Sequence, residues 1–233
     1  MSPYVRPAVE SLVFFDAQGQ VIDYGNRWSG SPPDDSYSVD SHTERFAPLL
    51  TVAEALIEYL EASFEVDVLE GPEVVAKMLR PREEATRTVR LEPRDPRSAP
   101  LTIQLVPYPG VGVEAGILRH SFFPHCGCDA CDETWESQAE GLEQLVLAVA
   151  DGGFWERPSP GGSSWVHTGH EHSEGGESGS VDASVYPAAR LEALRDPRRP
   201  ESGRWAPWPR RQVSPALSDG EPQPGGAAES TPQ

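Results

Sequence analysis

Three runs of strand-forming residues, joined by short connections, constrain the fold of this chain more than any other feature. Within the second run, apolar residues alternate with polar ones, which is the two-residue period of a strand with one buried and one polar face. The connections contain proline and glycine and are too short for helical crossovers, so we expect antiparallel neighbours in a meander. The runs are Thr86 to Glu92, Leu101 to Val106 and Val111 to Phe123.

Two further stretches have the spacing of amphipathic helices. Apolar residues recur at steps of three and four from Val52 to Leu60, and Thr51 to Glu54 has the form of a capping box, which predicts that a helix begins there. The same spacing runs from Trp135 to Val149, and Gly152 follows as a candidate left-handed cap. The predicted fold class is therefore α+β, an antiparallel sheet flanked by two or more amphipathic helices.

Shorter elements complete this predicted fold. Leu12 to Phe15 and Val21 to Tyr24 are apolar runs joined by a turn that contains Gly19, which predicts an N-terminal hairpin that adds to the meander. Residues 26–42 are rich in Ser, Pro, Asp and Gly, and we interpret them as a long surface loop. A strand from Phe64 to Val68 and a short helix from Pro72 to Leu79 are also expected.

Composition divides the chain into one domain and three further segments. The 24 prolines and 21 glycines are concentrated in the last third, so residues 1–155 are predicted as a single α+β core domain with a cysteine loop at 120–132. Residues 156–180 are interpreted as a mobile loop rich in Gly, Ser and His. Residues 181–211 are expected to dock on the core through Trp205 and Trp208, and residues 212–233 to form a disordered tail.

The charge of the chain limits its partners. A formal net charge of -18 argues against binding to nucleic acid or to an anionic membrane. A nucleic-acid surface remains an alternative only for the arginines around Trp205 and Trp208. The chain shows no secretory signal and no membrane span, so a cytoplasmic protein is expected. An unidentified protein partner fits this composition, and the oligomeric state is left open.

All three cysteines lie within six residues of one another. Cys128 and Cys131 have the CxxC spacing that lets two thiolates bind one tetrahedral zinc ion, and Cys126 adds a third sulfur. His125 and His120 are the local candidates for a fourth ligand. More distant candidates lie at the end of the Gly-rich segment, namely His167, His170 and His172. Zinc is therefore the candidate cofactor.

Two alternatives to a zinc site remain open. In the first, the cysteines are small buried thiols without metal, and Asp129 or Asp132 caps the following helix. In the second, they are reactive thiols, although Asp129, Asp132 and Glu133 oppose a thiolate and no βαβ pattern follows. The signatures of zinc deaminases, HExxH metalloproteases, phosphate-binding loops and GxSxG hydrolases are absent. We therefore expect a non-enzymatic interaction module with structural zinc; a metal- or thiol-dependent enzyme or redox sensor is the alternative.

Three stretches of the chain carry a resemblance to a known family. They are the run CGCDACDxTW, the opening VIDYGNRWSGSPPDDSYSVDSHTERFAPL, and Tyr108-Pro109-Gly110 before a strand. Together they resemble an actinobacterial family of small proteins known as a domain of unknown function (DUF6226-like), over about residues 4 to 155. The resemblance implies a bacterial, intracellular protein. It implies no established activity, and no catalytic residue is carried over from it.

Overall fold

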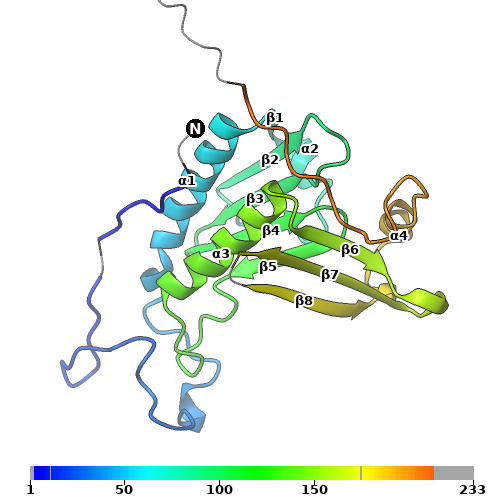
Figure 1. The fold of residues 1–233 in the computed structure, drawn as a ribbon. Coiled ribbons are helices and arrows are strands. Elements are labelled where there is room, and N and C mark those ends of the chain that lie inside the picture. Colours follow the sequence, from blue (N-terminus) through cyan, green and yellow to red (C-terminus); the bar gives the residue numbers. More distant parts are fainter. Residues whose placement is uncertain (1–2, 11, 174, 213–233) are drawn as a thin grey trace, which may run out of the picture.

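The protein folds around a five-stranded antiparallel sheet, which confirms the predicted α+β class (Figure 1). The computed structural model describes residues 3–10, 12–173 and 175–212 of the chain. The strand order follows the sequence, so each strand is hydrogen-bonded to the next one along the chain. The strands are β1 (Val66–Glu70), β2 (Arg87–Pro93), β3 (Leu101–Val106), β4 (Gly110–Ala115) and β5 (Arg119–Phe123).

Two long helices, α1 (Pro48–Ser63) and α3 (Trp135–Ala150), lie side by side on one face of this sheet (Figure 1). Their predicted apolar stripes are buried in a single core with that face. The predicted start of the first helix is wrong: α1 begins at Pro48, because proline fixes φ and has no N–H to leave unpaired in the first turn. The start of α3 agrees with the prediction, and Gly152 follows it with φ +79°.

The run Val111 to Phe123, predicted as one strand, is two strands joined by a tight turn at Gly116, whose φ is +61°. The N–H groups of Ile117 and Leu118 in this turn donate to the carboxylate of Glu156, at 2.7 and 2.8 Å. The turn therefore depends on a side chain that lies far along the sequence.

The second face of the sheet, predicted to be polar, is buried at its middle strand, β3. Thr102 and Gln104 of β3 are almost fully buried. The segment after the short helix α2 (Pro72–Val75) covers them, and the N–H of Arg82 donates to Gln104 Oε1 at 3.1 Å. A backbone N–H thus supplies the hydrogen bond that the buried Gln104 oxygen needs, while the guanidinium of Arg90 donates to the Thr102 hydroxyl.

The N-terminal hairpin forms but does not extend the sheet. Phe15 and Val21 make a single antiparallel bridge, and Gly19 takes φ +76° in the turn. Four apolar side chains of this hairpin stay exposed to solvent, namely Leu12, Val13, Phe15 and Val21. The prediction that the hairpin belongs to the meander is therefore wrong.

Residues 156–180 are not the loop that their composition suggested. They form most of a second antiparallel sheet, made of β6 (Phe154–Pro158), β7 (Trp165–His172) and β8 (Gly175–Asp182). In β7, Val166, Thr168 and His170 are buried at alternate positions. The interpretation as a loop is wrong because the glycines concealed this two-residue period.

The C-terminal segment joins the two sheets. After the helix α4 (Ala188–Leu194), the chain crosses both sheets, with bridges from Arg204 to Trp155 and from Ala206 to Ser98. Trp208 lies in the main core, and its Nε1 donates to the carbonyl of Ala99 at 2.8 Å. Short 3-10 helices occupy Asp34–Ser36, Thr43–Phe46, Pro160–Gly162 and Ala183–Val185.

The tail predicted for residues 212–233 lies outside the described residues except for Gln212. Within the part of the chain that the structure describes, no helix has the length and apolar character to cross a membrane.

Candidate metal centre

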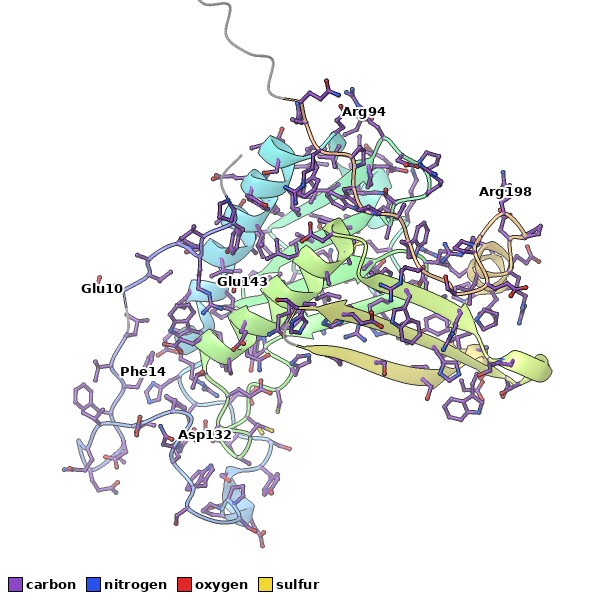
Figure 2. All side chains as sticks on the ribbon, viewed as in Figure 1. Glu10, Phe14, Arg94, Asp132, Glu143 and Arg198 are labelled. Carbon is purple, nitrogen blue, oxygen red and sulfur yellow. The ribbon has the colours of Figure 1, made fainter. Side chains whose placement is uncertain are left out.

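The three cysteine sulfurs converge in the loop between β5 and α3, beside Asp132 in Figure 2. The Sγ atoms of Cys126, Cys128 and Cys131 all lie within 4.8 Å of one another, and those of Cys126 and Cys128 are 3.2 Å apart. Sulfur ligands about 2.3 Å from a tetrahedral zinc ion lie roughly 3.8 Å from each other. The loop therefore holds its three sulfurs close to the spacing that one metal ion requires.

Neither of the two local histidines joins this cluster. The imidazole Nδ1 of His125 lies 3.0 Å from Gln138 Oε1, and its ring packs edge-on against Phe123. His120 lies on β5 opposite Glu114, and burial, followed by the charge of Arg80, lowers its pKa. Among the described residues, the group of ligand atoms within 4.8 Å of one another consists of the cysteines alone.

Residues 26–42, here called the wall segment, pack against the cysteine loop. The N–H of Asp129 donates to the carbonyl of Val39 at 2.7 Å, and the N–H of Ala130 donates to the carbonyl of Ser36 at 3.1 Å. The indole Nε1 of Trp28 donates to the carbonyl of Asp129. The stretch predicted only as a long surface loop therefore fixes the backbone between Cys128 and Cys131.

The acidic residues around the cysteines hold the loop together instead of capping α3. Asp132 Oδ2 accepts from the N–H of Arg27 at 2.9 Å, and Glu133 Oε2 accepts from the N–H of Cys126 at 3.0 Å. Thr134 is the residue that caps α3, through its hydroxyl and the N–H of Ser137. The alternative in which Asp129 or Asp132 serves as the helix cap is therefore wrong.

Arg45 supports this loop from the 3-10 helix before α1, and sequence reasoning missed it. Its side chain is only 3% exposed, and its guanidinium stacks on Tyr24 and Phe46, each at 4.3 Å to the ring centroid. Its Nη2 donates to the carbonyl of Gly127 at 2.8 Å, and its Nη1 to the carbonyl of Ser41. The only sequence signal is a charged residue directly before an apolar helix, which is too common to be informative.

Tyr108 occupies the space beside Gly127, so any side chain at position 127 would have to displace the Tyr108 hydroxyl. A Cβ on residue 127 would lie 2.0 Å from the Tyr108 hydroxyl oxygen. That hydroxyl donates to Asp40 Oδ2 at 2.9 Å, and burial, followed by Asp40, raises the pKa of Tyr108 to about 12. Tyr108 therefore stays a neutral donor near neutral pH and ties the β3–β4 turn to Asp40, with its hydroxyl beside Gly127.

The pKa values of Cys128 and Cys131 shift in opposite directions. Burial by itself raises the pKa of Cys128, but hydrogen bonds from Cys126 and from the N–H groups of Cys131 and Ser38 outweigh it, and the net shift is downward. Hydrogen bonds with Cys126 and Cys128 raise the pKa of Cys131. Of these two thiols, the buried Cys128 is therefore the one that the loop stabilises as a thiolate, the form that binds metal.

The distant histidines lie on β7, where they serve the second sheet. His167 Nε2 is hydrogen-bonded to the Ser159 hydroxyl at 2.5 Å. His170 is 4% exposed, and burial, followed by Arg119, lowers its pKa from 6.5, while Glu177 opposes this shift. None of these histidines belongs to the cysteine cluster.

The pKa of His170 predicts a loss of stability in acid. Because the folded protein keeps His170 neutral below pH 6.5, the unfolded chain binds a proton that the folded chain does not, and stability falls as the pH drops through this range. His170→Gln should lose less free energy of unfolding between about pH 7 and pH 5 than the wild type. Urea unfolding at both pH values measures this difference. An identical loss in the two proteins would show that His170 does not cause the loss of stability in acid.

Comparisons with known proteins place the whole described domain in one family. Residues 10–212 match the model of a family of unknown function, DUF6226, and this range includes both sheets and the cysteine loop. Neither the curated proteins nor the solved structures contain a match to the chain. Because the family model covers most of its length, the chain belongs to the DUF6226 family of proteins of unknown function.

Proposed function

We propose that this protein is a cytoplasmic, non-enzymatic interaction module whose cysteine loop binds one zinc ion through Cys126, Cys128 and Cys131. The observation that carries the proposal is the convergence of three sulfurs within 4.8 Å on a backbone that other segments hold from outside. Thiolate sulfur is a preferred ligand of zinc. Three cysteines within six residues are also more typical of free thiols or metal ligands in a reducing compartment than of a disulfide framework.

The fourth coordination position suits a ligand from outside the cluster. Cys131 is exposed, so the metal lies near the surface on this side. Two large apolar side chains of the wall segment, Tyr37 and Val39, are also exposed, at 54% and 43%. An exposed apolar surface beside a metal with three protein ligands favours a protein partner, whose side chain or a bound water completes the tetrahedron.

Metal content tests the zinc site directly. Protein purified without chelators should contain about one zinc ion per chain, and Cys128→Ser or Cys131→Ser should lose most of it because two sulfurs bind zinc weakly. His125→Ala and His120→Ala are the matched controls and should retain the metal, since neither ring joins the cluster. Less than about a tenth of an equivalent of zinc, even after anaerobic reconstitution, would rule out the proposal.

Removal of the metal separates a structural role from a catalytic one. If zinc holds the loop on its wall, a chelator should lower the melting temperature and expose the thiols to alkylation. A metal-free protein with an unchanged melting temperature would favour the enzyme or sensor alternative.

A redox sensor is the second candidate, and the 3.2 Å between the Cys126 and Cys128 sulfurs favours it. In this reaction the two thiols form one disulfide and lose two protons and two electrons, and one molecule of hydrogen peroxide is reduced to two molecules of water. Thiol counting before and after peroxide treatment tests this candidate. Loss of two thiols in the zinc-loaded protein at low peroxide would support the sensor, while protection by zinc would support the structural site.

A further inference from the structure

A second candidate site lies at the opposite end of the molecule from the cysteine loop. It is a pocket of about 640 Å³ between the β2–β3 connection, the β4–β5 turn and the segment that follows α4. Four of its lining residues are arginines, namely Arg97, Arg198, Arg199 and Arg204. Its volume lies within the range of small-molecule sites, which is about 300–1,000 Å³. In a chain with a net charge of -18, such a concentration of guanidinium groups calls for an explanation.

Two identical turns contribute to this pocket. The tetrapeptide Arg-Asp-Pro-Arg occurs at residues 94–97 and again at 195–198. In each turn the aspartate accepts from the N–H, Nε and Nη2 of the second arginine, with nearly equal distances in the two copies. Figure 2 labels the first arginine of one turn, Arg94, at the top of the molecule and the second arginine of the other turn, Arg198, at the upper right. The fold brings the two turns to one pocket.

Each turn presents a fixed guanidinium with unused donors. Arg97 and Arg198 are 80% and 89% exposed at their side chains, and each is paired with the aspartate two residues before it. A guanidinium has five N–H donors, and the aspartate takes two of them. In the described part of the chain, neither Nη1 makes a hydrogen bond. The free edge of each guanidinium matches the two oxygens of a carboxylate.

The pocket also has a rigid aromatic wall. The indole Nε1 of Trp205 donates to Glu156 Oε1 at 3.0 Å, and the guanidinium of Arg199 stacks on the indole at 4.0 Å. Ile117, Ala193 and Ala206 add apolar surface around it. A ligand body that covers Trp205 would be apolar or aromatic.

The charges at this site limit the charge of its ligand. Each of the four arginines already faces a carboxylate, at Asp95, Asp196, Glu156 and Glu171. The pocket is therefore locally close to neutral, and a polyanion would be repelled by the acidic remainder of the chain. We infer that this pocket binds a small organic monoanion, a carboxylate with an apolar or aromatic body.

The test uses a fluorescent aromatic monoanion, 8-anilinonaphthalene-1-sulfonate, titrated into the full chain. Arg97→Gln and Arg198→Gln should each weaken its binding by about three- to tenfold, because each removes a charge-assisted hydrogen bond near the surface. Arg94→Gln and Arg195→Gln are matched controls that make the same change at the first position of each turn. Neither residue lines the pocket, so both variants should bind the probe like the wild type.

Three results would overturn the inference. The first is an equal loss of binding in the control variants, which would reflect overall charge and not this site. The second is equally tight binding of N-phenyl-1-naphthylamine, the uncharged counterpart of the probe, which would show an apolar pocket without anion recognition. The third is displacement of the probe by inorganic phosphate at lower concentrations than by decanoate. Displacement by decanoate alone, with the zinc content unchanged, is the expected result.

Discussion

Replacing Glu156 with alanine should lower the free energy of unfolding by about 3–5 kcal/mol, a large part of the stability of a domain of this size. The carboxylate is fully buried and accepts from the N–H groups of Ile117 and Leu118 and from the indole of Trp205. Removing it leaves three buried donors without an acceptor. It also leaves Arg199, whose Nη2 lies 3.9 Å from the carboxylate, without its counter-charge.

Two further variants make this prediction specific. Glu156→Gln keeps one acceptor oxygen but places an amide NH2 against the donors that bonded the other oxygen. Its loss of free energy of unfolding should therefore be intermediate. Glu171→Ala removes an exposed carboxylate that pairs with Arg204 on the second sheet, and it should cost less than about 1 kcal/mol. Urea unfolding followed by circular dichroism measures all three. A loss below about 1 kcal/mol for Glu156→Ala would show that the β4–β5 turn does not depend on this carboxylate.

The second large effect is expected at Arg45. Arg45→Ala should lower the free energy of unfolding by about 3 kcal/mol, because it removes a buried guanidinium that stacks between two aromatic rings and donates to the half-buried carbonyls of Gly127 and Ser41. The same change should weaken zinc binding although Arg45 is not a ligand. The cysteine loop would have to be ordered by the metal instead of being held in place beforehand.

Arg82→Ala is the matched control for Arg45. Its guanidinium also stacks on an aromatic ring, Phe122 at 4.6 Å, but its side chain makes no hydrogen bond to the cysteine loop. Its stability should change by less than about 1 kcal/mol, and its zinc affinity should not change. Competition with a chromophoric chelator measures the zinc affinity. Wild-type affinity in Arg45→Ala would mean that the loop does not need this support.

The elements that were predicted correctly depend on local periodicity. β3 has the predicted bounds, and α3 begins at the predicted residue, because the alternation of apolar residues determines which face of each element is buried. The three cysteines also cluster as expected, since a CxCxxC spacing brings sulfurs together through a few backbone angles. Both features result from interactions between residues close in sequence.

The predictions that were wrong, or that could not be made, involve partners far apart in the chain. The ring of His125, a candidate ligand next to Cys126, lies against Gln138 of α3, and among the described residues the group within 4.8 Å holds the cysteines alone. The turn at Gly116 needs Glu156, while β7 is paired with β6 and contacts α3, and β8 is paired with β7.

The sequence by itself determined the α+β class, the helix and strand periods and the sulfur cluster, because short-range geometry is enough for each of them. Only the tertiary structure decided what surrounds these features. It placed Arg45 against Gly127, 82 residues away, and brought the Arg-Asp-Pro-Arg turns to one pocket. Hydrogen bonds and pockets of this kind are formed by packing between distant segments, and no local pattern of residues specifies them.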